Sequence, residues 1–318
     1  MPFSLEAISA AAAGIAPVFR HTPQFRAESL GAVLGCDVAV KVETVNPIRS
    51  FKGRGTDWFV QGLTETRPLV CASAGNFGQG LAYAARARGI PLTVFASVHA
   101  NPLKVERMRA LGATVRQVGA DFDAAKAAGQ AFARAQDERY VEDGREPPIA
   151  VGAASIAVEL LAAGDRYDTI VIPLGNGALL GGMATWIKAV APGTEVIGVC
   201  AAAAPSMKLS WERGTAIETT DASTIADGIA VRVPIPEALD SLRGIVDDIV
   251  LVDERQIIDS MRLTWRETGL VVEPAGVVGV TAIAADRPRF AGRRVATVLC
   301  GGNVTPQQAV EWRLTDPG

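Results

Sequence analysis

The sequence predicts an α/β protein built on open, largely parallel sheets that helices cover. The first observation is a series of short apolar or β-branched runs, namely VAVKVE, PLVCASA, LTVFAS, ATVRQV, TIVIPL, EVIGVC and RVATVLC. The second is that alanine-rich, helix-like stretches separate these runs, and this alternation is typical of βαβ units. The third is size, because 318 residues with 49% hydrophobic content can form two lobes with separate cores.

A division into two lobes is predicted from the polar segment DERYVEDGREPP, residues 137–148, which ends in two prolines. We expect a small α/β lobe over residues 69–145, inserted into a large lobe made of residues 1–68 and 146–318. Within the small lobe, GNFGQGLAYAARARG predicts a helix closed by Gly89, and NPLKVERMRALG predicts another closed by Gly112.

Composition narrows the classes of partner. The net charge is −3 and the basic residues are scattered, which does not indicate a nucleic acid or an anionic membrane surface. No apolar segment reaches the ~18 residues of a membrane span, and the N-terminal residues, which carry Glu6 without a basic start, predict a helix instead of a secretion signal. The four cysteines lie far apart in the sequence and there are only two histidines, which argues against a disulfide scaffold and against a zinc site. We therefore expect a cytoplasmic protein with no metal site.

Four junctions between a strand and a loop carry candidate site residues, because open parallel sheets bind ligands at the carboxyl ends of their strands. In PLVCASAGNFGQG, the residues Ser73, Ala74, Gly75 and Asn76 follow a strand and open a helix. The free N–H groups of such a helix start suit a carboxylate or another anion. The same residues also suit an ordinary capped helix with a glycine turn, so this segment alone does not distinguish an anion site from a plain helix start.

The second junction, TIVIPLGNGALLGGM, is glycine-rich and opens a helix with Gly175, Asn176, Gly177, Ala178 and Leu179. Glycines let the backbone approach a phosphate closely, and the helix start adds N–H donors. It is not a P-loop, since no Gly-Lys-Ser/Thr ends it, and a leucine replaces the third glycine of the dinucleotide fingerprint. A phosphate cradle is favoured over a nicotinamide site.

The remaining junctions are RVATVLCGGN, which delivers Cys300 to a glycine turn, and RSFKGRG, which places Lys52 beside Phe51 and two glycines. A lone cysteine after a strand is more often a small core residue. A lysine among an aromatic ring and glycines suits a desolvated, nucleophilic amine better than a solvated charge. Together, the amine, the phosphate cradle, the anion loop and the weak hydrogen-bonding thiol predict pyridoxal phosphate as the cofactor.

These four segments, in this order, resemble those of the fold-type-II pyridoxal-phosphate enzymes, most closely the serine/threonine dehydratases. The resemblance covers most of the chain and implies the two-lobed open parallel-sheet fold that is similar to tryptophan synthase β. The family's Ser-x-Lys-x-x-Gly motif, which supplies the lysine that binds the cofactor aldehyde, is matched by Ser50, Lys52 and Gly55. The resemblance places Phe51 near the cofactor ring and Ser50 near the substrate.

The other site residues follow from the same resemblance. The Ser-x-Gly-Asn loop that binds the substrate carboxylate is matched by Ser73, Gly75 and Asn76, with Ala74 and Phe77 beside them, and Asn76 would also reach the phenolic oxygen of the ring. The resemblance implies cofactor contacts from further residues, which are Gly175, Asn176, Gly177, Ala178 and Leu179 at the phosphate, Gly228 of ADGIAV, Glu273 of VVEPAG, and Cys300 facing the pyridine nitrogen.

The implied activity is that of an ammonia-lyase. Lys52 would take the α-proton of a small β-hydroxy amino acid of the L-threonine or L-serine type, and loss of the hydroxyl group would give a 2-oxo acid and ammonia. The resemblance also implies a homodimer or a higher homo-oligomer.

Three alternatives remain. The segment NPIRSFKGRG is also similar to threonine synthases, and Phe77 stands where dehydratases usually carry histidine, so a β- or γ-replacement enzyme is the main alternative. A nicotinamide dehydrogenase leaves Lys52 and the CGGN turn unexplained. A non-catalytic binding protein has no need for both the lysine and the carboxylate loop.

Overall fold

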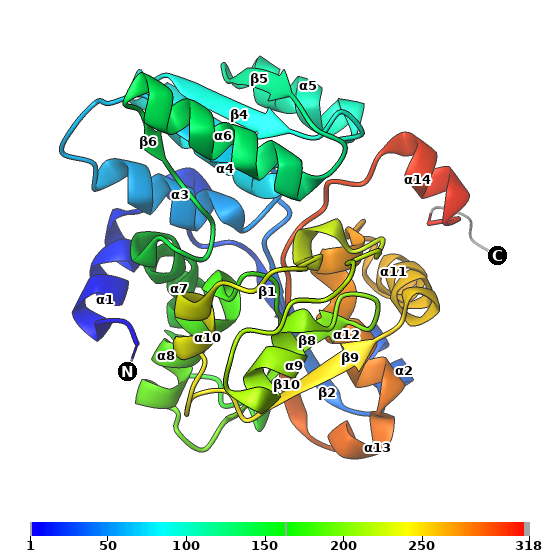
Figure 1. Cartoon of the computed structure of the whole chain (residues 1–318). Coiled ribbons are helices and arrows are strands. Elements are labelled where there is room, and N and C mark those ends of the chain that lie inside the picture. Colours follow the sequence, from blue (N-terminus) through cyan, green and yellow to red (C-terminus); the bar gives the residue numbers. More distant parts are fainter. Residues whose placement is uncertain (1, 163, 315–318) are drawn as a thin grey trace.

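Two sheets organise the chain in the computed structural model, which describes residues 2–162 and 164–314 (Figure 1). The six-stranded sheet has the order β1 (Gln24–Arg26), β2 (Asp37–Val42), β10 (Arg294–Leu299), β7 (Thr169–Pro173), β8 (Glu195–Ala201) and β9 (Asp248–Val252). The four-stranded sheet has the order β5 (Thr114–Gln117), β4 (Leu92–Ala96), β3 (Leu69–Ala72) and β6 (Arg139–Tyr140). Within these sheets β1 pairs antiparallel with β2, and the other pairings are parallel.

The helices lie on both sides of the sheets. They are α1 (Leu5–Gly14), α2 (Glu28–Leu34), α3 (Lys52–Gln61), α4 (Asn76–Ala87), α5 (Pro102–Ala110), α6 (Phe122–Gln136), α7 (Pro147–Ala162), α8 (Ala178–Val190), α9 (Ser206–Arg213), α10 (Pro236–Asp240), α11 (Glu254–Thr268), α12 (Pro274–Ala285), α13 (Arg287–Phe290) and α14 (Pro306–Glu311), with short 3₁₀ turns at Pro17–Phe19 and Asp227–Ile229. The predicted α/β class and all seven predicted strands are confirmed. The two small-lobe helices are confirmed as α4 and α5, and Gly89 and Gly112 follow them with the left-handed φ that glycine tolerates.

One of the two central strands of the large sheet is β10, the last strand of the described chain. Its residues pair with β2 on one side and with β7 on the other. Successive side chains of a strand point to opposite faces. Accordingly Val295 and Leu299 belong to the core cluster under α11 and α12, whereas Ala296, Val298 and Cys300 belong to the cluster on the other face. Cys300 directly follows this strand and lies at the edge where the other parallel strands end.

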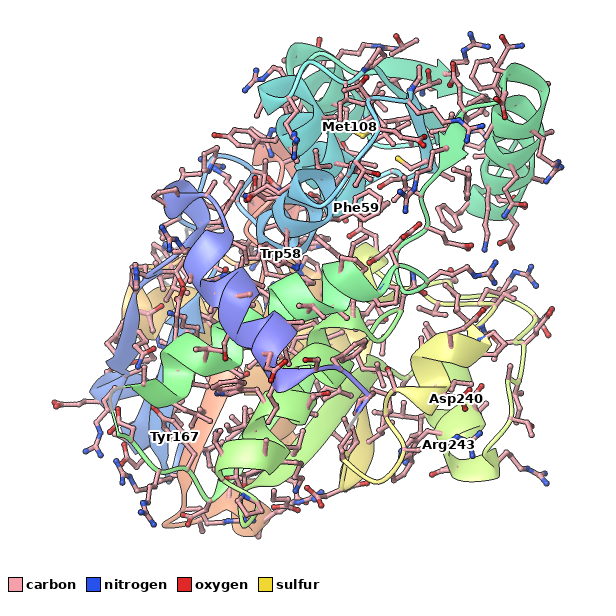
Figure 2. All side chains as sticks on the ribbon, turned by 90° about the vertical axis from the view of Figure 1, so that its left-hand side faces the viewer. Trp58, Phe59, Met108, Tyr167, Asp240 and Arg243 are labelled. Atoms are coloured by element: carbon pink, nitrogen blue, oxygen red, sulfur yellow. The ribbon has the colours of Figure 1, made fainter. Side chains whose placement is uncertain are left out.

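The four strands of the small sheet all fall between residues 69 and 140. Its core nevertheless includes Phe59 of α3 and Ile149 of α7, which come from outside that interval and pack with residues such as Met108 of α5 (Figure 2). Both helices therefore connect the two sheets. The lobe boundaries at residues 68 and 146 stay a prediction.

Close backbone contact fixes α3, the helix that begins at Lys52, against α7. A Cβ atom on Gly152 of α7 would lie 2.7 Å from the carbonyl oxygen of Arg54 and 2.7 Å from the Cα atom of Gly55. Real Cβ atoms do not approach backbone atoms so closely, so glycine at this position allows the two helices to touch. The position of Lys52 is thus set by helix packing. No helix within residues 2–162 and 164–314 is long and apolar enough to cross a membrane.

Candidate active site

A cavity of about 930 Å³ lies where the carboxyl ends of the two sheets face each other. Its wall contains residues of the β3–α4 loop, the β7–α8 loop, the start of α3, the start of α12 and the end of β10. The predicted site residues that line it are Phe51, Lys52, Ser73, Ala74, Gly75, Asn76, Phe77, Gly175, Asn176, Gly177, Ala178, Leu179, Gly228, Glu273 and Cys300. The structure therefore brings together segments that are up to 250 residues apart.

Ser50 is the predicted site residue that does not line this cavity. It is completely buried, and its hydroxyl group donates a hydrogen bond to the carbonyl oxygen of Cys300 at 3.4 Å. The hydroxyl oxygen of Ser50 also accepts a hydrogen bond from the backbone N–H of Lys52 at 3.3 Å, and Ser50 forms a β-bridge with Gly301. Ser50 therefore lies behind the cavity wall, where it ties the Lys52 segment to the end of β10, and its substrate contact stays a prediction.

Lys52 is the first residue of α3, and its amino group lies within the cavity wall. Its Nζ atom donates a hydrogen bond to Oδ2 of Asp143 at 2.5 Å, and the two side chains are 13% and 14% exposed. The same nitrogen lies 4.8 Å from the centroid of the Phe51 ring. Asp143 was not among the predicted site residues. It belongs to the segment that the sequence assigned to a connection between lobes, and its acidic pair with Glu142 was the available signal.

A buried polar network lies across the cavity at Asn76 and Glu273. The Nδ2 atom of Asn76 donates to Oε1 of Glu273 at 2.5 Å, and the backbone N–H of Asn303 donates to Oε2 of Glu273 at 3.0 Å. The side-chain amide of Asn303 donates to Oδ1 of Asn76 at 2.8 Å. Burial raises the pKa of Glu273, and the nearby Lys104 ammonium opposes that rise. Asn303, the last residue of the CGGN turn, was quoted in the sequence motif without a role and proves to hold this network.

The β7–α8 loop presents the uncapped start of a helix to the cavity. Gly177 precedes α8 with φ +85°, a left-handed conformation that favours glycine, and no side chain of the described residues caps the helix. A Cβ atom on Gly175 would lie 2.9 Å from the carbonyl oxygen of Gly228, so a second glycine permits close contact between two loops. The N–H groups at the start of α8 have no partner within the helix, and together with the helix dipole they suit a phosphate.

Cys300 contributes a neutral thiol at the end of β10. Its side chain is buried, and Sγ lies 3.7 Å from the carbonyl oxygen of Ala275. Burial raises the pKa of the Cys300 thiol, and the neighbouring Glu273 carboxylate raises it further. Cys300 therefore offers a weak hydrogen bond to a ligand without a charge.

These features fit pyridoxal phosphate. The cavity volume is in the range of small-molecule sites, the start of α8 suits the phosphate, and Lys52 supplies an amine that can bond to an aldehyde. A neutral thiol suits the neighbourhood of a ring nitrogen.

Comparison with known proteins decides the family. A family model described as pyridoxal-phosphate dependent enzyme matches residues 15–301. The chain belongs to the pyridoxal-phosphate-dependent enzyme family. It is 33% identical over 304 residues to an L-threonine ammonia-lyase of Thermotoga maritima, a match that covers 95% of this chain and 76% of that protein.

Solved structures give the same result for the fold. The crystal structure of a threonine deaminase from T.th. matches this pyridoxal-phosphate-dependent enzyme with a TM-score of 0.90 and 31% identity, covering 95% of this chain and 99% of that one. Maize serine racemase matches with a TM-score of 0.90 and 25% identity, covering 98% and 97%. The predicted family, fold type and cofactor are confirmed.

Proposed function

We propose that this pyridoxal-phosphate-dependent lyase removes the β-hydroxyl group of an L-threonine- or L-serine-type amino acid and releases a 2-oxo acid and ammonia. The observation that carries the proposal is the Lys52 amine, which lies in one cavity with the β3–α4 loop and the start of α8. The likeness to proteins named threonine ammonia-lyase and threonine deaminase supports it.

Each group has a role that follows from its place. We assign the N–H groups at the start of α8, from Ala178 onward, to the cofactor phosphate, and the β3–α4 loop around Gly75 to the substrate carboxylate. We assign Asn76, held by Glu273 and Asn303, to the ring's phenolic oxygen. These contacts would orient the substrate for proton transfer to the Lys52 nitrogen.

Proton transfer is then assigned to Lys52. When bound, pyridoxal phosphate supplies an electron-withdrawing ring that makes the α-proton of an amino acid removable. The Lys52 nitrogen holds the cofactor between turnovers and takes the α-proton when it is free. Phe51 and Phe77 are both buried and line the cavity, so their rings limit the access of water to these atoms.

The proposal is tested by incubating the cofactor-loaded enzyme with L-threonine and L-serine and measuring ammonia and 2-oxo acid. We expect equal amounts of the two products from at least one substrate, and none from Lys52→Ala. Lys208→Ala serves as the matched control, because Lys208 lies on α9 and pairs with Glu212 outside the cavity. Absence of both products from wild type, or unchanged release from Lys52→Ala, would overturn the proposal. A replacement enzyme would instead need a second nucleophilic substrate for turnover.

We further propose that the enzyme acts in the cytoplasm on a small amino acid, as a homodimer or higher homo-oligomer, and binds neither nucleic acid nor a membrane. The four cysteines support a reducing compartment, because all of them are buried and unpaired in the structure. Sedimentation of the loaded enzyme tests the assembly, and a monomer at micromolar concentration would contradict it.

A further inference from the structure

A carboxylate stands beside Lys52 in the cavity. Asp143 lies between β6 and α7, and its Oδ2 atom accepts a hydrogen bond from the Lys52 amino group at 2.5 Å. Its Oδ1 atom is buried and has no hydrogen-bond partner among the described residues. Because Oδ1 has no donor among these residues, the hydrogen bond from Lys52 is the contact that satisfies this carboxylate. Asp143 therefore holds the Lys52 amino group through one of its two oxygens.

The acid next to Asp143 in the sequence has cationic partners of its own. The adjacent acid, Glu142, forms ion pairs with Lys126 and, at 3.4 Å, with Arg145. The Phe51 ring and Cys300 also lie near Lys52, and the Cys300 thiol carries no charge at neutral pH because burial raises its pKa. Asp143 is thus the carboxylate that is positioned to hold the Lys52 amino group.

The segment that carries Asp143 is docked on the phosphate-binding loop. Gly144 has φ +88°, and a Cβ atom at that position would lie 2.6 Å from the carbonyl oxygen of Asn176. Only a residue without a side chain fits between these two backbones. Asp143 is consequently fixed between the lysine and the loop and does not swing freely toward solvent.

We propose that Asp143 is a positioning residue that holds the Lys52 amino group in place, through the hydrogen bond it accepts, whenever that nitrogen is not bonded to the cofactor. The inference rests on the proposed function, in which the freed Lys52 takes the α-proton. In that step the α C–H bond breaks, an N–H bond forms on Lys52, and the electron pair stays with the substrate. Asp143 accepts a hydrogen bond from the new ammonium ion.

The first test uses cofactor-free protein and no substrate. Lys52 is modified with an amine-reactive anhydride near neutral pH, and the rate is followed by mass spectrometry of the Lys52 peptide. Because the hydrogen bond to the Asp143 carboxylate holds the Lys52 amino group and is stronger than one to a neutral amide, we expect Lys52 in Asp143→Asn to be modified about ten-fold faster or more. Asp143→Glu should restore slow modification.

Glu146→Gln is the matched control for this measurement. Glu146 lies on the same segment and carries the same charge, but it pairs with Arg139 at 3.1 Å and does not line the cavity. We expect its Lys52 to be modified at the wild-type rate. Equal rates in wild type and Asp143→Asn, or an equally large increase in Glu146→Gln, would overturn the proposal. Asp143→Ser is measured in the same way as a second variant, in case the asparagine variant does not fold.

The second test uses the loaded enzyme. If Asp143 holds the proton-carrying Lys52, Asp143→Asn should lower kcat about ten-fold or more and change KM little, because the interaction acts after the substrate binds. A rise in KM with unchanged kcat would mean that Asp143 contacts substrate and would overturn the positioning role. The modification test needs no turnover, so it distinguishes failure of this inference from failure of the proposed activity.

Discussion

The charge network behind Lys52 predicts a large loss of stability for Arg54→Met. The Arg54 side chain is completely buried, and its Nε and Nη2 atoms donate to the carboxylate of Glu43 at 2.8 and 2.9 Å. Its Nη1 and Nη2 atoms donate to Glu159 at 2.7 and 2.9 Å. Lys41 also pairs with Glu159 at 2.7 Å. The network therefore holds two acids and two bases beneath α3.

The loss in free energy of unfolding is large because the substitution leaves a buried carboxylate without its cation. Methionine fills most of the volume of Arg54, but Glu43, which is also completely buried, loses its cation and two hydrogen bonds. Removing one partner of a buried ion pair costs about 3–5 kcal/mol. At roughly 2–4 °C per kcal/mol for a chain of this order of size, the melting temperature should fall by about 10 °C. Replacing Glu43 by leucine in the same protein should recover part of that loss, because no buried charge then remains uncompensated.

The assay is urea denaturation followed by far-UV circular dichroism, together with the melting temperature. Arg255→Met on α11 is the control, since Arg255 is 93% exposed and its 3.9 Å contact with Asp259 is a surface ion pair. We expect the control to change stability by less than about 0.5 kcal/mol. If Arg54→Met matched the control, the network would contribute no net stability and the reasoning would be refuted.

Three further predictions concern pH, the thiol and helix packing. Burial would raise the pKa of Glu159, but hydrogen bonds from Arg54 and Lys41 lower it to about 2. The stabilising contribution of this carboxylate is therefore present above its ordinary pKa of 4.5 and is lost as pH falls toward 2. The urea midpoint should decline over this pH range, and it should decline less steeply in Glu159→Gln. A higher midpoint at pH 3 than at pH 5 would contradict this. Cys300→Ser should keep the cofactor absorbance and most turnover, because a hydroxyl group can donate a comparable hydrogen bond, and loss of the cofactor would disprove that role. Gly152→Ala should destabilise the protein by about 1–3 kcal/mol, because the Cβ atom of the new alanine would meet the Arg54 carbonyl oxygen. Wild-type stability of this variant in urea would show that α3 and α7 can separate freely.

Local sequence pattern predicted most of the fold. Seven strands were visible because buried parallel strands read as short apolar runs between helix-like stretches. Three strands were missed. Two of them, β1 and β6, are three and two residues long, too short for any periodicity to register. The third, β9, carries the run DIVLV, a signal that was present and passed over.

Site residues that belong to a motif within one segment could be predicted from the sequence, whereas site contacts between distant segments could not. In the motifs around Lys52, Asn76 and Gly177, the neighbouring residues in the sequence are enough to indicate the chemistry. Asp143 is 91 residues from Lys52, so their contact depends on how the β6–α7 segment crosses the cavity. The position of Ser50 behind the wall is likewise set by its bridge to Gly301, which no local pattern reveals.

The central position of β10 in the large sheet has a consequence for synthesis of the protein. The partners β2 and β10 are roughly 250 residues apart, so the ribosome needs roughly 12 to 50 s to make the chain between them. Throughout that interval β2 has β1 on one side and an unpaired edge on the other, while the small sheet can already form from contiguous sequence. Nascent chains arrested before residue 294 should therefore contain a folded small sheet beside an open large one, and they should recruit chaperones that recognise exposed strand edges.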